Sequence, residues 1–543
     1  MPTLPDDAPV DLPEAIPYRP HLSPNQFYRE HLRPNLPVLL GPALTAHWPA
    51  RQRWARAAEL PWPADFPALS ELRRGVAEWA SSYPLDGLGF LNRLLELMER
   101  DTVTVDSDDG TGLAWRCLVP DTEHLVHRFG TARVCVTDCR ADPATASDAE
   151  ICRECTLAEY VKRHLRPNQK PEIGWSEDEC GSGTVWHTML DRLREVVSAR
   201  PPEKIDPTLL AERLGEFERH PRPSERGSSG SCATSKVPTP IPPPGHYYLK
   251  DWHMVRQFPE ARTYTTPEVF ADDWLNTFWD HRSTSAATAD HPDADDYRFV
   301  YIGAHGTWTP FHTDVFGSYS WSSNVCGIKH WILYPPSTQQ PSSNDTNHPT
   351  VIPTEGVHDI YRPDLAATFP TLQHPQTRRY HVYQLPGETL FVPSGWAHQV
   401  ENIGDTISIN HNWGNAANVV HLATVLRREL DRVEAAIADC RDLMDAIEWR
   451  DHCQVVLRAN HGMNYEEFYR YVAFNAERLM ATSNAEHPPD SWLIPGYIEW
   501  SLGQLRTALG SYLLADGRTA GMAWVQEARL LQQRIKRYPA TAV

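Results

Sequence analysis

Five short runs rich in β-branched and aromatic residues crowd the middle of the chain, and glycine, proline or asparagine bounds each of them. They cover residues 298–302, 329–334, 380–384, 389–392 and 406–410. Strands this short and this closely spaced favour a barrel or a sandwich over a helical core. We therefore expect residues 246–417 to form a β core around which the rest of the chain is arranged.

The segments on either side of this core have different patterns. Residues 20–165 mix short strand runs with helical spacing, the latter dominant over 48–97, and we expect them to support the core. Beyond it, apolar residues recur every third or fourth position from 419 to 447, which predicts a helical region over 418–543. The expected fold class is mainly β with flanking helices and a helical C-terminal region.

Two stretches are expected to have little fixed structure. Residues 1–19 contain several prolines and aspartates, which predicts a flexible N-terminus. An insertion is predicted over 166–245, and its part 199–244 is rich in proline and serine, with ten prolines from 201 to 244. Such a composition cannot bury enough apolar surface to order itself, so we expect this part to be disordered.

The charge balance excludes some classes of partner. Lys and Arg number 51 against 70 Asp and Glu, a formal net charge of −19. That balance argues against an extended nucleic-acid surface, which needs a basic patch, and it leaves room for a basic protein partner. The N-terminus lacks the basic start and apolar run of a secretory signal, and prolines break the uncharged stretch 35–50. We expect a cytoplasmic protein, without membrane contact, that could also enter the nucleus and whose ten cysteines are thiols.

Two histidines and one aspartate could meet inside such a barrel. His312 and Asp314 lie two positions apart, and residues i and i+2 of a strand face the same side. His398 is the third candidate. Two histidines and one carboxylate on one side of a metal are typical of non-haem Fe(II) oxygenases and leave coordination positions open. A histidine taken alone is more often a hydrogen-bonded core or surface residue.

The spacing around His398 supports this interpretation. The segment fits the cupin pattern of glycine, five residues, proline, one, glycine, two, histidine, three, asparagine, with its members at Gly387, Pro393, Gly395, His398 and Asn402. That pattern predicts a tight turn between two barrel strands and a histidine that points inward.

Two further features suggest a polar barrel interior. Lys329 lies on a predicted strand, where a lysine normally faces solvent, but an inward lysine could bind the distal carboxylate of 2-oxoglutarate. Strand 406–412 places Thr406, Ser408, Asn410 and Asn412 on one face and isoleucines on the other. A purely apolar barrel would not need such a polar face.

Two blocks resemble a JmjC domain: Trp308-Thr-Pro-Phe-His-Thr-Asp-Val-Phe316 with Gly327-Ile-Lys-His-Trp331, and Pro393-Ser-Gly-Trp-Ala-His398 with Thr406-Ile-Ser-Ile-Asn-His-Asn-Trp413. The segment Tyr248-Leu-Lys-Asp-Trp-His253 is similar to one branch of this family, that of JmjC domain-containing protein 4, a lysyl hydroxylase of the eukaryotic translation termination factor. The resemblance covers about 20–165 and 246–420. It implies a double-stranded β-helix, the cupin or JmjC barrel.

The resemblance also implies the site. Its Fe(2+) ligands fall on His312, Asp314 and His398, and its contacts to the co-substrate 2-oxoglutarate fall on Thr309, Lys329 and Asn410. Related hydroxylases often have an asparagine directly after the tryptophan at 321, whereas this chain has Ser322, followed two residues later by Asn324. Which of these two residues contacts the co-substrate stays open.

The activity implied is that of an Fe(II)- and 2-oxoglutarate-dependent dioxygenase. With O2 as second co-substrate, it would hydroxylate a lysine side-chain carbon of the termination factor. One alternative is a histone lysine demethylase, but those enzymes mostly carry glutamate at the carboxylate ligand, where this chain has Asp314. Another is a non-catalytic cupin scaffold, which would be expected if a ligand were missing.

Two other features leave alternatives open. Cys152-Arg-Glu-Cys155 has the spacing of a zinc-ligand pair, with Cys139 upstream and Cys180 downstream, but a zinc site usually needs two tight pairs. Residues 419–447 could form a partner or dimer face, although an amphipathic helix more often packs against its own domain. The sequence does not determine the oligomeric state.

Overall fold

The structure is a computed structural model of the 543-residue chain. It describes residues 12–62, 69–74, 86–107, 110–139, 141, 151–165, 247–284, 296–337, 352–353, 356–374, 377–483 and 496–538. The predicted insertion at 166–245, Cys180 and the first eleven residues of the predicted flexible N-terminus lie outside the described residues.

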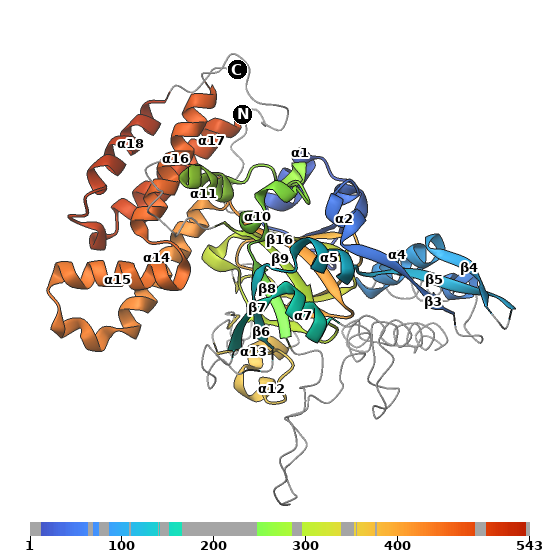
Figure 1. The fold of residues 1–543 in the computed structure, drawn as a ribbon. Helices are drawn as coiled ribbons and strands as arrows, with labels where there is room; N and C mark the ends of the chain where they lie inside the picture. Colours follow the sequence, from blue (N-terminus) through green and yellow to red (C-terminus); the bar gives the residue numbers. More distant parts are fainter. Residues whose placement is uncertain are drawn as a thin grey trace, which may run out of the picture.

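Two sheets, antiparallel in their central parts, face each other at the centre of the molecule (Figure 1). The smaller sheet has the order β10-β15-β12-β13, with β10 at Trp308–His312, β15 at Ala397–Asn402, β12 at Lys329–Tyr334 and β13 at Tyr380–Gln384. The opposing part of the larger sheet has the order β14-β11-β16-β9, with β14 at Thr389–Val392, β11 at Tyr319–Cys326, β16 at Thr406–Trp413 and β9 at Arg298–Gly303. This is the double-stranded β-helix that the sequence predicts, and all five strand runs named above are confirmed.

Apolar side chains fill one part of the space between the sheets. Trp331 and Val400 of the smaller sheet share a buried cluster with Leu390 and Val392 of the larger one. Burial of each such side chain contributes about 1.5–3 kcal/mol, so this cluster stabilises the contact between the two sheets. The other part of the interior is polar and contains the candidate site described below.

Strands from the first half of the chain extend the larger sheet at both edges. At one edge β14 pairs with β2 (Val38–Leu40), which pairs with β1 (Tyr18–Arg19). At the other edge β9 is followed by β8 (Tyr247–Trp252), β6 (Arg133–Asp138) and β7 (Cys152–Thr156). The helices α5 (Thr122–Phe129) and α7 (Leu157–His164) bury their apolar faces in the same cluster as Ile407 and Ile409 of β16. The N-terminal segment therefore contributes strands to the sheet that forms the barrel.

An arm projects from the barrel at the blue end of the colour scale (Figure 1). It consists of a three-stranded sheet, β3-β5-β4, and a helix, with β3 at Ala55–Pro61, β5 at Gly110–Pro120, β4 at Thr102–Ser107 and α4 at Asp86–Arg100. The predicted apolar stripe of α4 is confirmed, because Leu91, Leu94, Leu95 and Met98 are buried. The helical interpretation of 48–97 is wrong over 55–61, because β3 pairs with β5 along its whole length.

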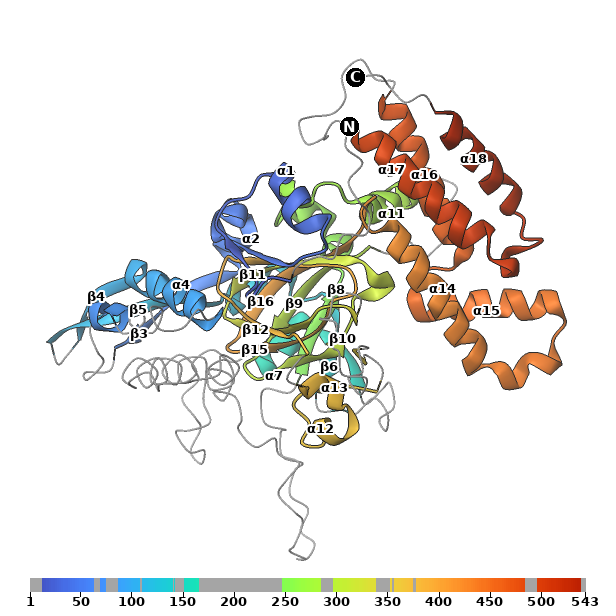
Figure 2. The same ribbon diagram turned by 180° about the vertical axis from the view of Figure 1, so that it is seen from behind.

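The C-terminal region is helical, as predicted, and lies to one side of the barrel (Figures 1 and 2). It contains α14 (Val419–Ala436), α15 (Ala446–His461), α16 (Tyr465–Ser483), α17 (Tyr497–Thr507) and α18 (Val525–Arg537). Together with α11 (Trp274–Thr284), these helices share one buried cluster, to which Phe316 of the barrel also belongs. Helix α14 thus packs mainly within the chain. None of the helices in the described ranges is long and apolar enough to cross a membrane.

One member of the cysteine pair with zinc-ligand spacing is bonded to another cysteine. Cys152 forms a disulfide with Cys135 on the neighbouring strand, and their Cα atoms are 6.2 Å apart. The expectation that all cysteines are thiols is therefore wrong for these two residues, and Cys152 is not available as a thiolate ligand. Cys139 and Cys155 remain thiols.

Candidate metal and co-substrate site

The structure brings His312, Asp314 and His398 together at one end of the barrel. One ligand atom from each residue lies within 4.8 Å of the others. His312 ends β10 and lies directly opposite His398 at the start of β15, so the strand pairing itself places the two imidazoles side by side. Among the residues that the structure describes, this is the one cluster of His, Cys, Asp and Glu with the geometry of a metal site.

Backbone carbonyl groups orient both imidazole rings. The Nδ1 atom of His312 is 2.7 Å from the Pro310 carbonyl oxygen, and Nδ1 of His398 is 3.0 Å from that of Trp396. A ring that donates from Nδ1 has its lone pair on Nε2, which is the tautomer that a metal ligand needs. Burial, and then the neighbouring His398, lower the pKa of His312. The ring is therefore neutral near physiological pH, as ligation requires.

One carboxylate oxygen of Asp314 is fixed by its neighbour. The Ser320 hydroxyl donates to Oδ2 at 2.7 Å, which leaves Oδ1 for another partner. The backbone after Asp314 turns tightly, because the Gly317 amide donates to the Asp314 carbonyl at 3.0 Å. Second partners of this kind hold a ligating carboxylate in one orientation.

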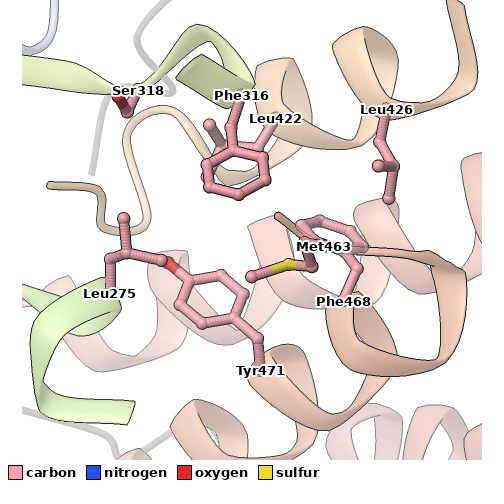
Figure 3. A pocket seen from close by; sticks show the side chains of 8 residues that line it. All are labelled: Leu275, Phe316, Ser318, Leu422, Leu426, Met463, Phe468 and Tyr471. Carbon is pink, nitrogen blue, oxygen red and sulfur yellow. The ribbon is translucent and has the colours of Figure 1, made fainter. Parts of the chain in front are cut away.

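Phe316, inside that turn, has a left-handed backbone with φ of +60°. Bulky residues rarely adopt this conformation, and it persists only where the surroundings enforce it. Packing against the C-terminal helices holds this conformation at Phe316. The Phe316 ring lies between Leu422 on α14 and Tyr471 on α16, beside an apolar cavity of about 10 Å³ (Figure 3). The loop that carries Asp314 is therefore anchored in the helical region.

The turn before His398 is held from two sides. Asn35 both donates to the Ser394 carbonyl at 2.9 Å and accepts from the Ser394 amide at 3.0 Å. Asn418, just before α14, donates to the Ser394 hydroxyl at 3.0 Å. Segments before and after the barrel thus hold the turn before His398, and the C-terminal helices also anchor the loop that carries Asp314.

Lys329 lies inside the barrel rather than at its surface. It is 2% exposed, and its Nζ donates to the Tyr248 hydroxyl at 2.8 Å. Burial lowers its pKa to about 7, and no carboxylate pairs with it in the described part of the chain. A buried cation without a counter-ion is costly, so this position favours an anionic ligand.

The sequence did not predict a role in the site for Tyr248, although this residue lies in a segment that carries the family resemblance. No local signal marks it, because only the folded sheet makes Gly303 the partner of Tyr248. A Cβ atom on Gly303 would lie 2.8 Å from the Tyr248 ring and 2.2 Å from the Asn402 amide. The glycine lets these two polar side chains approach the interior together.

The other predicted contacts lie on the same interior surface. The Thr309 Oγ1 accepts from the Val400 amide at 3.2 Å, so its hydroxyl hydrogen remains available. The Ser322 hydroxyl donates to the Asn410 side-chain oxygen at 3.0 Å, which leaves the Asn410 amide hydrogens. Asn324 uses its amide nitrogen to donate to the Gly327 carbonyl at 2.7 Å, within the turn that follows β11.

Several polar atoms in this interior have no protein partner. Four buried side-chain oxygens without a hydrogen bond belong to Asn324, Asn402, Thr406 and Ser408. The predicted polar face of β16 therefore points inward, while Ile407 and Ile409 on its other face are buried in the cluster outside the barrel. Buried polar atoms are normally satisfied, so this group fits a polar ligand or ordered water beside Lys329.

Comparison with known proteins places this fold and site in a class. Residues 299–413 match the family described as "JmjC domain, hydroxylase", which has a cupin-type fold. The predicted resemblance to a JmjC domain is therefore confirmed over residues 299–413.

Within this class the chain is similar to proteins named "2-oxoglutarate and iron-dependent oxygenase JMJD4". It is 42% identical to the one from Homo sapiens over 242 residues, which are 44% of this chain and 53% of the relative. It is 43% identical to "Arginine-specific demethylase JMJ20" of Arabidopsis thaliana over 42% of this chain and 48% of the relative. "JmjC domain-containing protein 1" of Schizosaccharomyces pombe is 27% identical over 90% of this chain and 87% of the relative. The chain spans about half the length of the first two.

Proposed function

We propose that the chain is an Fe(II)- and 2-oxoglutarate-dependent oxygenase. The observation that carries the proposal is the placement of an uncompensated buried lysine in the same barrel as a His-Asp-His cluster. The three ligand atoms fit the facial triad of non-haem iron enzymes. Lys329 and the unpartnered oxygens fit the remote carboxylate of an oxo-diacid and its bound water.

One set of side chains would bind the iron and another would bind 2-oxoglutarate. Nε2 of His312, Nε2 of His398 and one oxygen of Asp314 would hold the iron. Lys329 and the Tyr248 hydroxyl would bind the far carboxylate of 2-oxoglutarate, to which Thr309 could donate its hydroxyl hydrogen. When bound, iron and 2-oxoglutarate supply the oxidation of a C–H bond by O2, with succinate and CO2 as by-products. The protein contributes orientation and a shielded site.

We further propose a lysine of the translation termination factor as the substrate, and the cytoplasm, with access to the nucleus, as the compartment. Similarity to the JMJD4 proteins over about 44% of this chain supports this assignment. The substrate would be a protein side chain, in keeping with the net charge of −19 and a basic partner.

A second candidate is demethylation, which the similarity to a relative named as an arginine-specific demethylase favours. Hydroxylation of an N-methyl group gives a carbinolamine that loses formaldehyde, so the same site could serve either reaction. The scaffold alternative gains no support from the structure, because all three candidate ligands are present and a binding scaffold has no use for a buried unpaired lysine.

Mass spectrometry distinguishes these possibilities. The full chain is incubated with Fe(II), 2-oxoglutarate and full-length termination factor, and in parallel with histone peptides that carry methylated lysine or arginine. A lysine that gains the mass of one oxygen supports the hydroxylase; loss of a methylene mass from a histone peptide supports the demethylase. Turnover unchanged by Asp314→Ala would refute the metal assignment.

A further inference from the structure

A carboxylate at the edge of the barrel interior has no part in the proposed binding of iron and co-substrate. Asp251 lies in β8, where the pairing with β9 shifts register between Leu249 and Trp252. Its backbone is left-handed, with φ of +58°. Such bulges redirect a side chain out of the regular strand pattern, and they are common next to active sites.

The Asp251 carboxylate is hydrogen-bonded to a residue of the interior. Tyr301 pairs with Ser408 of β16, whose side chain is buried inside the barrel. The Tyr301 hydroxyl donates to Asp251 Oδ1 at 2.5 Å. Its ring centre lies 6.0 Å from Nζ of Lys329 and 5.9 Å from the ring centre of Tyr248. Tyr301 therefore connects the co-substrate end of the interior with Asp251.

The charge of Asp251 is not neutralised by a basic side chain in the described part of the chain, where Tyr301 is its hydrogen-bond partner. Asp251 is exposed, so water and a ligand can reach it. Burial, and next the Asp251 charge, raise the pKa of Tyr301 well above its usual value, which keeps the hydroxyl protonated as the donor.

The same pair lies on the metal side of the barrel. Tyr301 lies close enough to Asp314 for the charge of that carboxylate to add to the rise in the Tyr301 pKa, after burial and Asp251. A side chain that approaches the metal from this edge therefore passes an aromatic face and an open carboxylate. These two groups attract cations, one through its ring and the other through its charge.

We propose that Asp251, held in place by Tyr301, binds the positively charged end of the substrate side chain. This inference rests on the proposed function and deepens it: the substrate side chain is cationic, with either an ammonium or a guanidinium group. Both candidate reactions, on lysine and on arginine, meet this condition. Asp251 is then a specificity-determining residue and takes no part in oxidation.

A binding experiment tests the pair without turnover. The full chain is loaded with Mn(II) and 2-oxoglutarate, and proton NMR records the paramagnetic broadening of n-butylammonium, n-butylguanidinium and uncharged n-butanol. We expect broadening of at least one of the two cations and little of n-butanol, and the cation that is broadened identifies the preferred group. Asp251→Asn should reduce the cation effect about tenfold, because it keeps the hydrogen bond and tolerates the left-handed backbone but removes the charge.

Matched variants complete the test. Asp442→Asn, which removes an exposed carboxylate of the C-terminal region, should leave the broadening unchanged. Tyr301→Phe should weaken it less than Asp251→Asn, since it frees the carboxylate but keeps the ring. The inference would be overturned if the unaltered chain broadened the signals of neither cation, or if it broadened those of n-butanol equally. Broadening of a cation that persists in Asp251→Asn would also overturn it.

Kinetics with the termination factor separate this inference from the proposed function. Asp251→Asn should raise KM for the protein about tenfold while kcat and KM for 2-oxoglutarate stay nearly constant; an unchanged KM would count against the inference. If the unaltered chain does not modify the factor but binds n-butylammonium through Asp251, the substrate assignment fails and the cation site stands.

Discussion

Replacement of Lys329 by methionine should make the protein more stable and unable to bind its co-substrate. The lysine pKa falls from 10.5 to about 7 on burial. Each pKa unit of this shift corresponds to about 1.4 kcal/mol, so below pH 7 the buried cation lowers the free energy of unfolding by about 5 kcal/mol. Methionine fills a similar volume without charge, but it leaves the Tyr248 hydroxyl without its partner, which costs about 1–3 kcal/mol. We expect a net gain of about 2–4 kcal/mol in the free energy of unfolding at neutral pH.

The gain should depend on pH in a defined direction. Between the folded pKa of about 7 and the unfolded value near 10.5, the unfolded lysine binds more protons than the folded one, so the unaltered chain becomes more stable as pH rises. The advantage of Lys329→Met should therefore shrink by up to about 1.4 kcal/mol per pH unit above neutrality. Urea unfolding of both proteins without ligand, at about pH 7 and about pH 9, measures this difference while the effects of other groups cancel.

The same experiment with 2-oxoglutarate and Mn(II) tests function. The co-substrate should stabilise the unaltered chain, by about 2.7 kcal/mol at a hundred times its Kd, and should not stabilise Lys329→Met. Its affinity for the unaltered chain should fall by up to tenfold per pH unit above pH 7, because the ammonium must be protonated to bind it. The reasoning would be refuted if Lys329→Met were less stable than the unaltered chain, or if the stability difference between the two proteins did not change with pH. It would also be refuted if Lys329→Met bound 2-oxoglutarate as tightly as the unaltered chain does.

Other perturbations follow from the ligand loops. Asp314→Ala should abolish the rise in Tm that Mn(II) gives the unaltered chain, measured by calorimetry with and without the ion; an equal rise would show that the ion binds elsewhere. Ser320→Ala should weaken Mn(II) binding about 10–100-fold in a calorimetric titration, since the carboxylate loses its second partner; undiminished affinity would contradict that role. Phe316→Ala should cost about 3–5 kcal/mol in urea unfolding and also weaken Mn(II) binding, and normal ion affinity in the folded variant would show that the anchor does not position Asp314.

The sequence predicted the barrel and its metal cluster because both depend on local spacing. The expectation that His312 and Asp314 share a strand is wrong, because β10 ends at His312 and Asp314 lies in the loop that follows; their closeness along the chain still makes them neighbours. The turn pattern around Gly395 places His398 opposite His312. The alternation in 406–412 predicted the polar interior for the same reason. That alternation survives folding because strand geometry enforces it.

What spacing could not predict depends on contacts between distant segments. Tyr248 reaches Lys329 across the interior, and Asn35 holds the turn before His398 although more than three hundred residues separate them. The error over 55–61 has a related origin, since apolar spacing there favoured a helix while pairing with a distant strand determined the outcome. Nothing in the local sequence marks Asp251 either, because its position depends on a register shift against β9.

The anchoring of Phe316 sets a lower limit on the size of a working fragment. A polypeptide cut to the JmjC match, residues 299–413, would keep every candidate ligand but discard the helices around this ring and the strands that extend the larger sheet. The left-handed turn after Asp314 would then lose its restraint and relax toward ordinary backbone angles. Excision of the recognisable domain would thus yield a peptide with the right residues and a misplaced carboxylate.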